Sequence, residues 1–74
     1  MAFIGVLINE ERDDSVPVSV SRDRGAAMDS LVTRVLGMGI SDGSVAVIER
    51  DLNDAEFEHL QDVLLSFFTE QGIV

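Results

Sequence analysis

The first apolar stretch of the chain, residues 2–8, has the length and composition of a β-strand. Side chains of an extended strand alternate between two faces, and both faces would be apolar here. One face would carry Phe3 and Leu7. The other face would carry three aliphatic residues: Ile4, Val6 and Ile8. A strand that is apolar on both faces is typical of the centre of a sheet.

A second strand follows a polar loop. Residues 16–21 alternate valine with proline or serine, which indicates one buried and one exposed face. Pro17 has no amide hydrogen to donate to a ladder, so we expect this strand at an edge of the sheet. The two strands together predict a hairpin.

The hydrophobic period then changes from two to that of a helix. Four residues share one helical face at spacings of three and four: Met28, Leu31, Val32 and Val35. We predict a helix from about Asp23 to Leu36, ended by Gly37 and Gly39, and then a turn over residues 41–44. Residues 45–48 are apolar and predict a third strand.

The second helix has a well-defined start. Asn53 is a favourable N-cap, Glu56 can bond back to its amide, and Leu52 can pack on Phe57 across the first turn. An apolar stripe follows, made of Phe57, Leu60, Leu64, Phe67 and Phe68. We expect this helix to end near Gly72.

The element order predicts an α+β fold, with residues 1–74 forming a single ββαβα domain. The two strands with two apolar faces should be neighbours, which gives a three-stranded mixed sheet of order 2-1-3. The third strand would be antiparallel to the first and parallel to the second. Two helices would pack on this sheet.

An apolar sheet face that helices leave uncovered usually marks an interface. The chain has no cysteine, so disulfides cannot add stability to so small a core, and self-association is the remaining common means. We therefore predict a homodimer formed through the sheet. Its expected interface residues are Phe3, Ile4, Val6 and Ile8.

The charge balance determines which partners the chain can bind. Fourteen Asp and Glu residues oppose five basic residues, all arginine, and the formal charge is −9. Such a chain repels nucleic acids and anionic membranes and attracts basic surfaces. No apolar run approaches the length of a membrane span and no basic leader precedes residues 2–8, so we expect a soluble, cytoplasmic protein.

Residues that could support catalysis or ligand binding have ordinary structural explanations. His59 has no evident nucleophile or second base, and acids near Asn53 favour a helix N-terminus without any metal. The glycines of residues 37–43 follow a helix, whereas phosphate loops precede one. Arg22 and Arg24 have many acids to pair with. We expect no catalytic residue, cofactor or metal.

The acidic residues are the candidate binding surface. Four lie on one predicted loop: Glu10, Glu11, Asp13 and Asp14. Glu58 and Asp62 are four residues apart on the second helix, where like charges repel. Leu65 is on the polar side of that helix and could anchor a partner. Because self-repulsion costs stability, this pattern favours a role in steering toward a basic partner.

In size and charge the chain resembles the small antagonists that phages encode against host defence complexes, including anti-CRISPR proteins. The resemblance implies a non-enzymatic inhibitor or regulator of a basic, nucleic-acid-binding partner or nucleoprotein complex, acting in the host cytoplasm. One alternative is a structural or assembly homo-oligomer of a salt-adapted organism or virus. Another is a small-molecule regulatory domain that uses the turn from Gly37 to Gly43.

Overall fold

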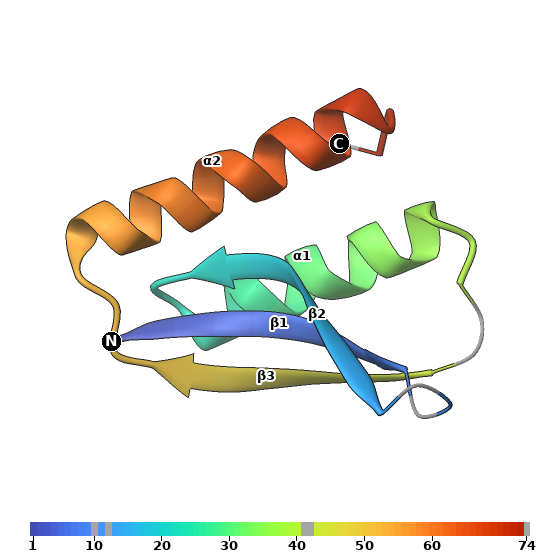
Figure 1. Ribbon diagram of the computed structural model, residues 1–74, viewed down its shortest axis with the longest axis horizontal. Helices are drawn as coiled ribbons and strands as arrows, with labels where there is room; N and C mark the ends of the chain where they lie inside the picture. Colours follow the sequence, from blue (N-terminus) through green and yellow to red (C-terminus); the bar gives the residue numbers. More distant parts are fainter. Residues whose placement is uncertain (10, 12, 41–42, 74) are drawn as a thin grey trace.

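The computed structural model describes residues 1–9, 11, 13–40 and 43–73, which form a ββαβα fold (Figure 1). The elements in chain order are β1 (Ala2–Asn9), β2 (Asp14–Ser21), α1 (Arg24–Gly37), β3 (Ser44–Arg50) and α2 (Asp54–Glu70). The predicted element order is therefore confirmed. None of the helices in the described part of the chain is long and apolar enough to cross a membrane.

The sheet has the predicted order β2-β1-β3, and β1 is antiparallel to both of its neighbours. β3 therefore runs parallel to β2 on the other side of the central strand. Pro17 lies on the edge strand β2 opposite Val6, where its missing amide hydrogen does not interrupt the centre of the sheet.

The β1–β2 ladder contains an irregularity that the alternating sequence does not reveal. Gly5 pairs with Ser19 and Val6 pairs with Pro17, so Val18 is an additional residue in β2. The extra residue changes which valines are buried. Val18 is 2% exposed while Val16 is 51% exposed, so the prediction that all the valines share one face is wrong.

Helix α1 covers the face of the sheet that carries Gly5. A Cβ atom at Gly5 would lie only 2.9 Å from the Cβ of Leu31, closer than packed carbon atoms approach. On the same face, the buried Ser19 hydroxyl donates a hydrogen bond to the Ala27 carbonyl at 2.7 Å. Small residues on the sheet and on α1 therefore allow close packing between them.

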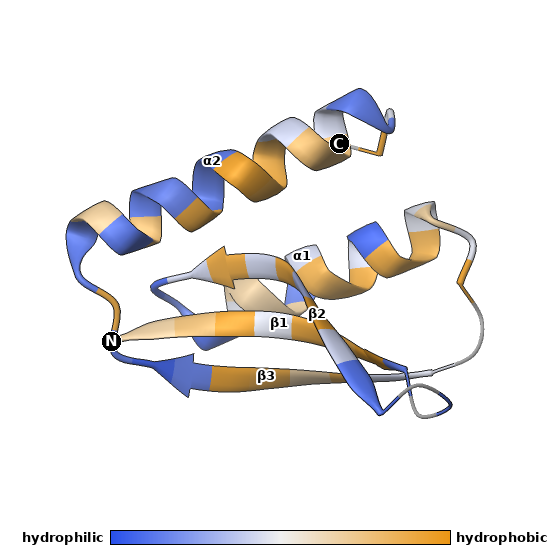
Figure 2. Cartoon of the chain, in the orientation of Figure 1, coloured by the Kyte–Doolittle hydropathy of each residue, from blue (hydrophilic) through white to orange (hydrophobic). Residues whose placement is uncertain are grey.

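Helix α2 packs along the edge strand β2, whereas α1 packs against all three strands (Figure 1). The buried α2 residues Leu64 and Phe68 form the core with Val18 of β2 and Leu31 of α1. Figure 2 shows the apolar residues of α2 interspersed with polar ones along the helix. Phe67, which the sequence places in the buried stripe, is 49% exposed, because the apolar residues of α2 outnumber those that β2 and α1 can cover.

Arg34 of α1 makes a hydrogen bond to the backbone of β2 at the outer edge of the sheet. One guanidinium nitrogen, Nη1, donates a hydrogen bond to the Val18 carbonyl at 2.7 Å. The same guanidinium lies 4.7 Å from the centre of the Phe68 ring of α2, within cation–π range. Burial lowers the pKa of Arg34 from its ordinary value, although a guanidinium remains protonated at neutral pH.

The ends of both helices follow local sequence signals. Asn53 and Glu56 form the predicted reciprocal capping box at the start of α2. Asp23 caps α1 by accepting a hydrogen bond from the Ala26 amide at 2.8 Å. Gly37 is the last residue of α1, and the left-handed conformation after the helix is adopted by Gly39, with φ of 72°.

The close approach of α1 to the sheet predicts that Gly5→Ala is destabilising. The added methyl group would meet both Ser19 and Leu31, so we expect the free energy of unfolding to fall by about 1–3 kcal/mol. Urea denaturation followed by circular dichroism measures this change. Gly25→Ala is the matched control, because its Cβ would meet only the Asp23 carboxylate, at 3.3 Å. If Gly5→Ala and Gly25→Ala have equal free energies of unfolding, α1 does not pack closely against Gly5.

Candidate functional site

A hollow of about 400 Å³ lies between α1 and α2 above the edge strand β2. Residues from three elements that are distant in sequence form it. The lining residues, which we call the groove, are Val20, Ser30, Arg34, Gln61, Asp62, Leu64 and Leu65.

The groove combines an apolar floor with polar walls. Leu64 is buried beneath it, and Leu65 is 46% exposed beside it, which confirms the prediction that Leu65 is a surface leucine. Ser30 of α1 and Gln61 of α2 are exposed and can exchange hydrogen bonds with a ligand. The charge of Arg34 is already directed at the Val18 carbonyl and the Phe68 ring.

A second hollow, of about 280 Å³, continues the groove along α1. It shares Ser30 and Arg34 with the first and is bounded by Asp29, Thr33 and Ile73. Together the two hollows follow α1 for more than one helical turn. The surface is therefore elongated along α1.

Carboxylates stand on both sides of this surface. Glu58 and Asp62 lie one helical turn apart on α2, and Asp29 lies on α1. All three are exposed, and within the described part of the chain neither Glu58 nor Asp62 makes an ion pair. Their charge is thus available to a basic ligand.

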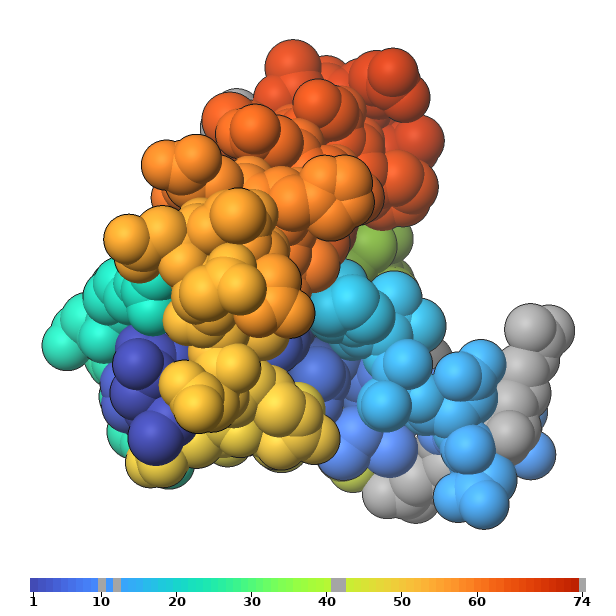
Figure 3. Space-filling view, turned by 60° about the vertical axis from the view of Figure 1, so that its left-hand side comes forward, coloured from blue at the N-terminus to red at the C-terminus, as the bar shows by residue number. Residues whose placement is uncertain are grey.

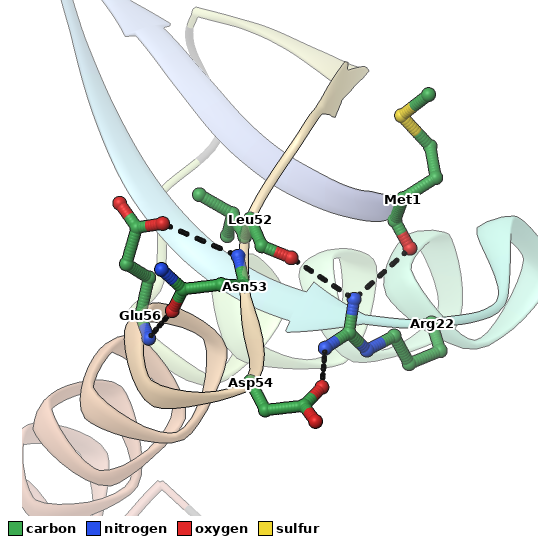
Figure 4. Close-up of polar contacts among 6 residues, drawn as sticks. All are labelled: Met1, Arg22, Leu52, Asn53, Asp54 and Glu56. Carbon is green, nitrogen blue, oxygen red and sulfur yellow. Dashed lines mark hydrogen bonds and ion pairs between the residues drawn. The ribbon is translucent and has the colours of Figure 1, made fainter.

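Asp54 precedes Glu58 by one turn but has a structural role (Figure 4). It accepts a hydrogen bond from Nη2 of Arg22 at 2.9 Å. Nη1 of Arg22 also donates to the carbonyls of Met1 and Leu52, at 3.3 and 3.4 Å. The guanidinium lies 4.3 Å from the centre of the Phe57 ring. Arg22 therefore fastens the first turn of α2 to the N-terminus and to the end of the sheet.

The predicted acidic surface is divided into two parts. Glu11, Asp13 and Asp14 are exposed at the β1–β2 hairpin, which points away from α2 in both Figure 1 and Figure 3. Glu10 lies outside the described residues. The structure brings Asp62 and Leu65 together in the groove, with Glu58 one turn away, but does not bring the hairpin acids to them.

The other candidate residues lie at separate places in the fold. His59 is exposed on α2, and no three His, Cys, Asp or Glu side chains among the described residues are grouped to hold a metal ion. Asn53 and Glu56 bind each other's backbone amides in the capping box. Arg24 pairs with Glu49 at 3.8 Å and lies 5.5 Å from the Phe3 ring. In the turn from Gly37 to Gly43, residues 41 and 42 lie outside the described part.

The residues predicted for a sheet-face dimer are partly enclosed within the single chain. Ile4 and Val6 are only 9% and 8% exposed, while Phe3 and Ile8 are half-buried. The dimer itself remains a prediction. These exposures mean that Ile4 and Val6 offer little apolar area to a second chain.

Sequence analysis did not identify most of the groove. One signal was available in Arg34, a cation between Leu31 and Val35 on the apolar face of α1. A charge in that position needs a partner across the helix interface. The partner, a β2 carbonyl, becomes apparent only when the strands and helices are assembled.

Comparisons with protein-family models, with curated proteins and with solved structures gave no match to this chain.

The Arg22 contacts predict that Arg22→Lys is destabilising even though it keeps the charge. A lysine cannot bond two carbonyls and a carboxylate from one planar group, so we expect a loss of about 1–2 kcal/mol in unfolding free energy. Thermal denaturation compares it with Arg50→Lys, which alters an exposed arginine that bonds only the adjacent Glu49 carbonyl. If both variants have the same melting temperature, the contacts of Arg22 do not hold α2 in place.

Proposed function

We propose that this protein is a non-enzymatic acidic binding protein that receives a basic segment of a partner protein in the groove between α1 and α2. The observation that supports this most is the exposed Leu65 with the carboxylate of Asp62 at the rim of a hollow, and Glu58 one helical turn away. Among the described residues neither carboxylate makes an ion pair. An amphipathic segment with basic and apolar residues is complementary to that combination.

The partner that fits best is a nucleic-acid-binding protein or nucleoprotein complex, which the chain inhibits or regulates. Segments that bind phosphates carry clustered lysine and arginine. A groove with Asp62 in its lining and Glu58 and Asp29 nearby, on a chain of charge −9, attracts the same segments and competes with the nucleic acid for them. This mode of action agrees with the resemblance in size and charge to phage-encoded antagonists, and the proposal includes action in the cytoplasm of a host.

Apolar burial and charge contribute to such binding in different ways. Each exposed ion pair adds only about 0.2–1 kcal/mol. Covering the exposed half of Leu65 adds about 1 kcal/mol, at roughly 25 cal/mol per Å². The apolar contacts therefore supply affinity at least as much as any single charge does. The carboxylates mainly raise the association rate and select basic segments.

The test uses two synthetic peptides that differ only in charge. One is an amphipathic helix of leucine with lysine and arginine, and the other replaces each basic residue by glutamate. We expect only the basic peptide to shift the amide resonances of Ser30, Gln61 and Leu65 in NMR spectra of the labelled protein. The shift should diminish as the Debye length falls from roughly 10 Å at 0.1 M salt to about 3 Å at 1 M.

Matched variants separate the groove from the overall charge. The double variant Glu58→Gln and Asp62→Asn should weaken binding of the basic peptide by about three- to tenfold. The double variant Asp13→Asn and Asp14→Asn removes the same amount of charge at the hairpin and should weaken binding of the basic peptide less. Asparagine tolerates the positive φ of 52° at position 13. Equal weakening by both variants would show that the net charge, not the groove, attracts the peptide.

A second candidate is an assembly protein adapted to high salt, which the exposed carboxylates and the absence of lysine favour. This function predicts that folding of the chain itself depends on molar salt. Circular dichroism in dilute buffer and in molar salt separates the two functions. A chain that folds only in molar salt would favour the second candidate, and a chain that is folded in dilute buffer would favour the binding protein.

A further inference from the structure

The outer edge of β3 is open, unlike that of β2. β3 pairs with β1 on one side, and no element of the described residues lies along its other side (Figure 1). Alternate amide and carbonyl groups of such an edge point outward and can pair with another strand. The edge has little of the usual protection, since Ser44–Arg50 contains no proline or lysine and its two charged residues lie at its C-terminal end. In Figure 2 it is coloured apolar for most of its length.

An exposed apolar stripe of α1 lies beside this edge. Met28, Val32 and Leu36 follow each other at intervals of four residues and are 38%, 41% and 71% exposed. Arg34 reaches the β2 edge, and Val32 is about 200° from it around the helix, which directs Val32 to the β3 side. Val45 of β3, at 41% exposure, is on the face of the sheet that α1 covers.

The charge distribution favours a second copy of this chain as the occupant. Residues 44–48 carry no charge, and the two charges at the end of β3, Glu49 and Arg50, are of opposite sign. The acids of the hairpin and of α2 lie on other parts of the surface. Two chains of charge −9 can therefore approach most closely along this edge. A basic protein, in contrast, would gain no ion pair with residues 44–48.

We propose that two copies pair β3 with β3 antiparallel around a two-fold axis near Val47, which gives a six-stranded sheet. In this register Val45 lies opposite Glu49 of the second copy, Ala46 opposite Ile48, and Ser44 opposite Arg50. No like charges oppose one another, which a two-fold pairing requires for stability. The α1 stripes of the two copies meet on one side of the sheet.

The contact is long enough to form a dimer interface. Seven residues at about 3.3 Å each give an edge of about 23 Å, compared with a longest molecular dimension of 32 Å. The surface differs from the sheet face predicted from the sequence, since Ile4 and Val6 are already buried. The groove lies at the opposite edge of the sheet, so each copy keeps its own groove and this inference is independent of the proposed function.

A pair of charge variants at one position tests both the interface and its register. Val45→Glu would place a carboxylate opposite Glu49 of the second copy twice per dimer, and we expect the dissociation constant to rise at least tenfold. Val45→Lys would place an ammonium opposite the same carboxylate and should keep the dimer. Val16→Glu and Val16→Lys are matched controls at an exposed β2 valine, and both should dimerise as the natural chain does. Analytical ultracentrifugation across micromolar concentrations measures each constant.

Two further results would overturn or support the inference without relying on these variants. Hydrogen exchange of the β3 amides in the natural chain should slow as the protein concentration rises, because pairing protects the outward amides. Val32→Glu, on the α1 stripe, should weaken the dimer without changing the circular dichroism spectrum. A chain that stays monomeric at hundreds of micromolar, or dissociates equally with glutamate and lysine at position 45, would overturn the inference.

Discussion

Arg34 makes the interaction on which the rest of this structure depends. Its guanidinium donates to the Val18 carbonyl at the outer edge of β2 and lies against the Phe68 ring. One side chain of α1 thus connects the edge strand, its own helix and α2. The carbonyl that it satisfies would otherwise be left without a partner where α2 packs. Because α2 rests on this edge, the space between the helices becomes a groove.

The two edges of the sheet consequently differ. The β2 edge carries an arginine and a helix, while β3 lacks a neighbour on its outer side within the described residues. The charges are divided in a similar way. Arg22 pairs with Asp54 and Arg24 pairs with Glu49, so two of the five arginines form exposed ion pairs within the chain. Among the described residues, Glu58 and Asp62 near the groove make no ion pair.

The sequence by itself determined the elements, their order and the sheet topology. Apolar periodicity distinguishes strands from helices, because side chains alternate in one and recur about every 3.6 residues in the other. Pro17 assigned β2 to an edge because it lacks a donor. The capping box of Asn53 and Glu56 was predictable since it depends on residues only three positions apart. Exposure of Leu65 followed from its angle to the apolar stripe.

Only the tertiary structure decided where these elements meet. The extra residue Val18 depends on pairing with β1, and it leaves Val16 exposed although the sequence predicts that it shares the buried face of Val18. The groove combines residues of β2, α1 and α2, and no local pattern records that Arg34 faces a carbonyl 16 positions earlier in the chain. Gly5 likewise looks like an ordinary strand interruption until α1 is placed against it. Local periodicity determines the type of an element and most of its buried face, whereas contacts between distant segments determine what that face is buried against and where the pattern fails, as at Val16 and Phe67.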